Sequence, residues 1–132
     1  MRMKEMIILL SFLGILIGCS DTVSTSYIGY DDIVADKSIE RGWMPAIIPK
    51  SAFHIKESHD IDTNTGQGLF QFRSTDISDF KENLGAEVDS QRRDSLREKY
   101  NLPHGEVYQW KKFIFSINWD RNEAEFRLIG DA

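Results

Sequence analysis

Cysteine is nearly absent from this sequence, which has a single one, Cys19, among 132 residues. One thiol cannot close a disulfide within the chain, so the fold has to be held by its hydrophobic core. The sequence also lacks a glycine-rich phosphate-binding loop and the Gly-x-Ser-x-Gly elbow of a serine hydrolase. With no nucleophile in a recognisable setting, we expect no catalytic residues and no cofactor.

Basic residues are scarce relative to acidic ones, at 16 against 21, and the net charge is −5. Arg2, Lys4 and Glu5 belong to the first 18 residues, so the rest of the chain has 14 basic and 20 acidic residues, a net charge of −6. A surface this acidic disfavours phosphate backbones and anionic lipid heads. We therefore expect no nucleic-acid partner, whereas a basic protein partner is permitted.

Long apolar runs are absent except at the amino terminus, where residues 6–18 follow a short segment that carries Arg2 and Lys4. This run is shorter than the roughly 18–20 residues that a spanning helix needs. It ends in Leu-Ile-Gly-Cys, which resembles a bacterial lipobox. We therefore expect residues 1–18 to be a lipoprotein signal peptide, removed before Cys19, and the Cys19 thiol to be lipidated.

Lipid on Cys19 would hold the chain on a membrane, because more than one acyl chain gives stable anchoring. Ser20 resembles the outer-membrane type of sorting residue, and Asp21 comes one position too late to resemble the inner-membrane signal. We predict a lipid anchor in the bacterial cell envelope, at the outer membrane and facing the periplasm. Residues 19–26 are predicted to be the lipidated cysteine and a polar tether, and residues 27–132 a single domain.

Two pairs of segments with alternating polarity predict two β-hairpins. Residues 53–62 alternate apolar and polar side chains, and Phe70 and Phe72 share one face of the strand that follows a turn at residues 63–66. Residues 111–119 and 123–129 repeat this arrangement more clearly. Each strand has one apolar face, which suits an antiparallel sheet with one covered side.

Helix-forming stretches occupy the sequence before and between the hairpins. We expect helices over residues 31–41, 77–84 and 89–100, with Gly42 and Gly85 placed to end the first two. The prediction is therefore an α+β fold, in which an antiparallel sheet of about four strands, made of two hairpins, has helices on one face.

Five polar residues of the first hairpin are candidates for binding a ligand: Glu57, His59, Asp60, Asp62 and Asn64. The run from Asp60 to Asn64 resembles the start of a calcium loop, but the positions that require Gly and Glu in a helix–loop–helix site hold other residues. The simpler interpretation is a turn in which Asp and Asn side chains accept hydrogen bonds from nearby backbone amides. We favour the turn.

The histidines of this hairpin do not suit a shared metal. His54 and His59 are an odd number of residues apart, so a regular strand points them to opposite faces, and we expect no metal site. His59 shares its face with Glu57. That pair is either a hydrogen-bonded pair at the edge of the core, which we favour, or an acid/base pair of a hydrolase.

Residues 42–52 (Gly-Trp-Met-Pro-Ala-Ile-Ile-Pro-Lys-Ser-Ala) followed by residues 55–64 (Ile-Lys-Glu-Ser-His-Asp-Ile-Asp-Thr-Asn) resemble the YbbD head domain family. Its members are small bacterial proteins that are often lipoproteins. The resemblance implies a compact α+β domain and makes residues 43–64 the place to look for a function. It implies no particular activity.

These observations predict a membrane-anchored lipoprotein that acts as a protein-interaction module of the cell envelope. Its expected partners are the membrane, through lipid on Cys19, and an envelope protein. The alternative is a domain that binds a small ligand or a cation through the region from His59 to Asn64.

Overall fold

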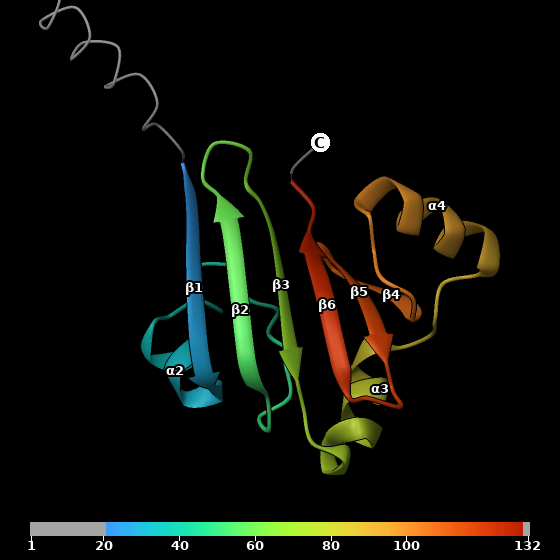
Figure 1. Cartoon of the computed structure of the whole chain (residues 1–132), viewed down its shortest axis with the longest axis horizontal. Helices are drawn as coiled ribbons and strands as arrows, with labels where there is room; N and C mark the ends of the chain where they lie inside the picture. Colours follow the sequence, from blue (N-terminus) through green and yellow to red (C-terminus); the bar gives the residue numbers. More distant parts are fainter. Residues whose placement is uncertain (1–20, 131–132) are drawn as a thin grey trace, which may run out of the picture.

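The computed structural model describes residues 21–130, so the expected signal peptide and Cys19 lie outside the described residues. The described part of the chain folds around one sheet, with short helices at its margins (Figure 1). The strands are β1 (Thr22–Gly29), β2 (Phe53–Asp60), β3 (Thr65–Gln71), β4 (Glu106–Trp110), β5 (Phe113–Asn118) and β6 (Glu123–Leu128). The helices are α2 (Tyr30–Ala35), α3 (Ile77–Leu84) and α4 (Ser90–Tyr100), with a short 3-10 turn, η2 (Ser74–Asp76), before α3.

All six strands belong to one antiparallel sheet, with the order β1-β2-β3-β6-β5-β4. Both predicted hairpins are confirmed, as β2–β3 and β5–β6. They are joined side by side through β3 and β6, where Gly68 lies opposite Phe126. A Cβ added to Gly68 would lie 2.3 Å from the Phe126 ring, so this joint requires a glycine.

The predicted α+β fold with about four strands is wrong, because the structure is a six-stranded, mainly β fold with few short helices. The two strands that the sequence did not reveal, β1 and β4, are the edges of the sheet. An edge strand has one neighbour and little buried surface, so its apolar alternation is weak. Tyr27 is the only buried residue of β1, and residues 22–26, expected in a polar tether, form most of that strand.

The first predicted helix is shorter than expected, because α2 ends at Ala35 and not at residue 41. Lys37 has a left-handed backbone (φ 56°), which stops the helix, and the chain continues in turns. The other two helices are confirmed: Gly85 ends α3 with φ 76°, and the Asp89 side chain caps α4 by accepting a hydrogen bond from the Arg92 amide. Among residues 21–130, no helix is both long and apolar enough to cross a membrane.

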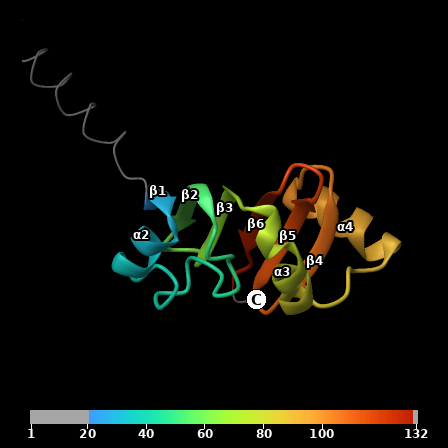
Figure 2. The ribbon, with the colours of Figure 1, turned by 90° about the horizontal axis from the view of Figure 1, so that it is seen from below.

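Helices cover both faces of the sheet, not one face as predicted. On the first face, α2, α3 and the segment between α2 and β2 pack on the larger core, which includes Phe70, Phe80, Phe115 and Phe126 (Figure 2). On the second face, α4 covers only the β4–β5 end, where Val107 and Ile114 meet Leu102. None of the described helices lies on the second face over β1, β2, β3 and β6, and we call this area the open face.

Candidate functional site

The structure separates the five candidate residues into two groups. Glu57 and His59 are on the covered face of β2 and are buried. Asp60 ends the strand, and Asp62 and Asn64 lie exposed in the turn between β2 and β3. The five side chains therefore do not converge on one site.

Glu57 and His59 form a buried hydrogen-bonded pair, with 2.7 Å between His59 Nδ1 and Glu57 Oε1 and side chains only 2% and 6% exposed. The Trp43 indole stacks on the imidazole, with 3.8 Å between the ring centroids and an interplanar angle of 8°. Burial raises the pKa of Glu57, an effect that the hydrogen bond from His59 opposes. The favoured interpretation, a histidine paired in the core, agrees with this geometry, because Trp43 and the sheet enclose the pair.

The segment that carries Trp43 is fixed above this pair by a second set of polar contacts. The Tyr27 hydroxyl donates to Asp36 Oδ2 at 2.5 Å, and Arg41 donates to the same oxygen at 3.0 Å. The lining of the Glu57–His59 pair thus comes from β1, β2 and the turns after α2. Such an arrangement holds a buried polar pair in one geometry.

The turn after β2 has the geometry that the sequence predicted for it. Asp60 Oδ1 accepts hydrogen bonds from the backbone amides of Asp62 at 2.8 Å and Thr63 at 3.2 Å. A hydrogen bond to the neighbouring Asp21 carboxyl is the main cause that raises the pKa of Asp62. Asn64 adopts a left-handed backbone (φ 54°), as asparagine does readily in turns. Within residues 21–130, no group of three or more His, Cys, Asp and Glu side chains is placed to hold a metal ion.

His54 lies away from this turn, at the opposite end of β2. Its backbone is left-handed (φ 48°), and the β2–β3 pairing shifts register between Phe53 and Lys56. The exposed imidazole hydrogen-bonds through Nδ1 to Gln71 Oε1 at 3.0 Å. His54 is therefore on the open face, whereas His59 is on the covered one.

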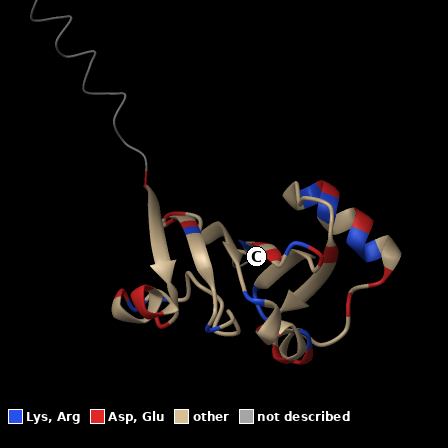
Figure 3. Ribbon diagram, turned by 60° about the horizontal axis from the view of Figure 1, so that its bottom comes forward, with Lys and Arg blue, Asp and Glu red and all other residues tan. Residues whose placement is uncertain are grey.

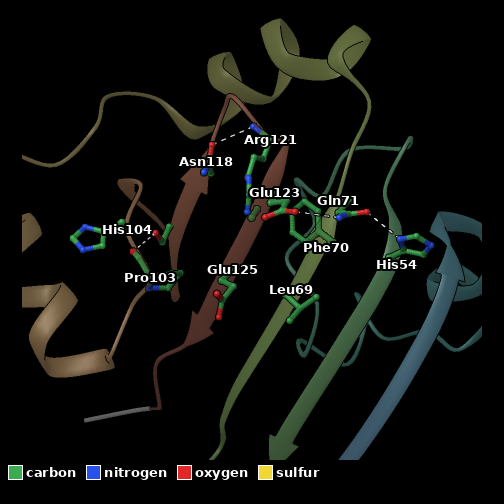
Figure 4. A pocket seen from close by; sticks show the side chains of 12 residues that line it. His54, Leu69, Phe70, Gln71, Pro103, His104, Asn118, Arg121, Glu123 and Glu125 are labelled. Carbon is green, nitrogen blue, oxygen red and sulfur yellow. Dashed lines mark hydrogen bonds between the residues drawn. The ribbon is translucent and has the colours of Figure 1, made fainter.

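A groove of about 380 Å³ lies on the open face, between β3, β6 and the segment before β4 (Figure 4). Its polar side chains form a hydrogen-bonded row across three strands, from His54 through Gln71 to Glu123, since Gln71 Nε2 donates to Glu123 Oε1 at 3.2 Å. The other groove residues labelled in Figure 4 are Leu69, Phe70, Pro103, His104, Asn118, Arg121 and Glu125.

A second hollow of about 460 Å³ continues over β1, β2 and β3, and it shares Leu69 and Glu125 with the groove. Leu69 is 41% exposed and is the apolar centre of this otherwise polar surface. The remaining lining is mostly hydroxyl, amide and basic side chains, from residues that include Ser24, Ser26, Lys56, Ser58, Gln67 and Arg127. An exposed leucine ringed by hydrogen-bonding groups has the apolar centre and polar surround that protein interfaces show.

Among the open-face residues, His54 was considered from the sequence, as a metal ligand that its odd spacing from His59 excludes, but Gln71, Glu123 and Leu69 were not. Gln71 and Glu123 come from different hairpins and become neighbours only through the β3–β6 pairing. The signal that was present is Leu69, an apolar residue on the polar side of its strand.

Comparisons with curated proteins and with solved structures found no match to this chain. A family model does match, over residues 21–71, which contain β1, α2, β2 and β3 together with Trp43, Glu57 and His59. The resemblance noted on residues 42–52 and 55–64 is thereby confirmed and extends to the first strand. Over this segment, which ends where β3 ends, the chain is similar to the YbbD head domain.

Proposed function

We propose that this chain is a lipid-anchored interaction module of the bacterial cell envelope, which binds another envelope protein on the open face of its sheet. The observation that carries the proposal is the open face itself. Two hollows meet there at Leu69, an exposed apolar residue surrounded by hydrogen-bonding side chains. Protein interfaces commonly combine an apolar centre with a polar rim.

The proposed anchor places strong limits on where this module acts. Lipid on Cys19 remains a prediction from the lipobox, as does an outer-membrane location facing the periplasm. Because β1 begins at Thr22, only two residues, Ser20 and Asp21, would separate the lipidated cysteine from the sheet, and the three residue steps from Cys19 to Thr22 reach about 10 Å. A chain anchored in this way would meet its partner directly at the membrane surface.

The anchor is tested by metabolic labelling with a clickable fatty acid in a bacterial host. We expect label on the mature chain, loss of label in a Cys19→Ser variant, and a mass that corresponds to cleavage before residue 19. An unmodified thiol in the native product would overturn the proposed anchor.

The binding surface is tested by placing a photo-crosslinking amino acid at Leu69 of the full chain in cells. The matched control site is Val34, which is 54% exposed on α2 and away from the open face. We expect a discrete crosslinked band from position 69 and none from position 34. Equal crosslinking from both positions, or none from position 69, would contradict the proposal.

A small polar ligand bound in the groove is the second candidate. The volume of about 380 Å³ lies within the range of small-molecule sites, and the row from His54 to Glu123 supplies donors and acceptors. A thermal-shift screen tests it, since a ligand of the native state raises the melting temperature. A shift that Gln71→Ala abolishes would favour this candidate over a protein partner.

A further inference from the structure

Among residues 21–130, the outer edge of β1 has few of the features that usually keep an edge strand unpaired. The strand runs for eight residues, Thr-Val-Ser-Thr-Ser-Tyr-Ile-Gly, without a charge or a proline. Seven of its residues pair with β2 in one register, from Thr22 opposite Asp60 to Gly29 opposite Phe53. Natural proteins usually protect such edges with charged residues, prolines, bulges or a covering segment.

The other edge of the sheet has that protection. β4 has only five residues, and the Val88 amide donates a hydrogen bond to the Val107 carbonyl from outside the sheet. Arg92 of α4 donates to the Gln109 side chain on the same strand. The two edges therefore differ: contacts from outside the sheet cover the backbone of β4, whereas the outer edge of β1 is left more accessible.

The backbone of β1 presents hydrogen-bonding groups in the outward direction. The Ile28 amide donates to the Asp32 side chain at 3.1 Å and is therefore turned away from β2. Alternate residues of a strand direct their backbone groups to the same side, so those of Ser24 and Ser26 also point outward. Val23 and Ile28 are 42% and 86% exposed, which leaves apolar surface beside this edge.

Acidic residues stand at both ends of the uncharged strand, as Figure 3 shows. Asp21, Asp60 and Asp62 are at its start, where the Asp21 and Asp62 carboxyls are close enough to raise the pKa of Asp62. Asp31 and Asp32 are at its end, in a depression that Lys50 also lines, so two carboxylates there face one cation. A second copy paired antiparallel would set one acidic end against the other, and like charges disfavour that pairing.

We propose that β1 is completed by an extended segment of the partner protein, with an uncharged core and Lys or Arg residues at both ends. This inference rests on the proposed function and names the chemistry of its partner. The segment adds a seventh strand through backbone hydrogen bonds, and its basic ends select this edge by charge.

Three synthetic peptides test the proposal against the full chain purified in detergent. All three share a seven-residue core of alternating Thr and Val. The first has two Lys at each end, and the second has two Glu at each end. The third has the same sequence as the first, but alternate amides of its core are N-methylated. We expect saturable binding of the first, weakened by salt, and binding of the other two weaker by about tenfold or more. Equal binding of the N-methylated peptide would overturn strand addition.

Two substitutions in the chain provide the complementary test. Asp31→Lys should weaken binding of the lysine-flanked peptide, whereas Asp79→Lys, at an exposed position in the first turn of α3, should not. Ser26→Pro removes one outward amide and should abolish binding while the melting temperature stays close to that of the parent chain. Equal effects of the two lysine substitutions would overturn the charge selection.

Two further results would each overturn the proposal. One is the absence of saturable binding by the lysine-flanked peptide. The other is a concentration-dependent dimer in sedimentation analysis that Ser26→Pro abolishes, because the occupant would then be a second copy. Both are distinguishable from failure of the proposed function, since crosslinking at Leu69 in cells does not depend on either outcome.

Discussion

The two halves of the sheet bury different kinds of side chain. In β5 the five residues from Phe113 to Ile117 are all buried, and four of them are apolar. In β2 the buried set includes the Glu57–His59 pair, and the neighbouring β3 has glycines at 66 and 68. An apolar strand contributes stability at little cost, whereas a buried polar pair is stable only if its geometry is kept. We therefore expect the β4–β6 half to contribute most of the stability, whereas the β1–β3 half depends on keeping the geometry of its buried polar pair.

Phe126→Ala should cause the largest loss of stability, because Phe126 lies where the two halves of the sheet meet. The Phe126 ring is fully buried and contacts Phe70, Phe113 and Phe115, with centroid distances of 5.8–6.4 Å. Its removal leaves a cavity between the two halves and should lower the free energy of unfolding by about 3–5 kcal/mol. Chemical denaturation monitored by tryptophan fluorescence measures the loss. A loss below about 1 kcal/mol would contradict the inference that β5 and β6 contribute most of the stability.

A smaller loss is expected from Gly68→Ala, which acts at the joint between the halves. The added methyl group would lie 2.3 Å from the Phe126 ring and 2.7 Å from the Lys56 carbonyl oxygen, so the strands must shift apart. We expect a loss of about 1–3 kcal/mol in the free energy of unfolding. Gly29→Ala is the control, because a Cβ added there has its nearest contact at 3.9 Å. Gly85→Ala is unsuitable as a control, because the backbone at Gly85 has a φ of 76°.

Glu57→Gln should change how stability depends on acid pH, with a smaller effect than the two substitutions above. Burial raises the pKa of Glu57 above its usual 4.5. Its protonated form is thus favoured by folding, and the stability that it contributes is fully present below pH 4.5 and lost as pH rises through the raised pKa. Glutamine cannot titrate, so this decline should be absent from the variant's stability measured between pH 4 and 8. Parallel profiles for the two proteins would contradict the assignment.

Tyr108→Phe is the counterpart in the β4–β6 half and acts in the alkaline range. Burial, together with the hydrogen bond to Glu106, raises the pKa of Tyr108 from 10.0 to about 12. The stability that the protonated phenol contributes is present below pH 10 and lost between pH 10 and 12. We expect the unmodified chain to lose stability more steeply than the variant over this range. A thermal melt series at constant ionic strength measures the difference, and identical slopes would count against it.

The local sequence pattern was sufficient to predict the inner strands of the sheet, each of which has a neighbour on both sides. The alternation over residues 53–62 and 111–129 predicted both hairpins, and the two-residue spacing of Glu57 and His59 predicted their pairing on one face. β1 and β4 were missed because an edge strand buries too few residues to show alternation. Trp43 on His59 and the groove around Gln71 and Glu123 could not be predicted, because both depend on contacts between segments that are distant in the sequence.

The β3–β6 pairing joins the segment that matches the YbbD head domain to the rest of the chain. That segment ends at residue 71, so it carries β3 without the strand that completes it here. Detached from β6, β3 would have bare backbone amides and carbonyls along one side, and Phe70 would lose its cover. In this chain, residues 72–130 therefore complete the sheet that the matched segment begins, because they supply the strand that lies along β3.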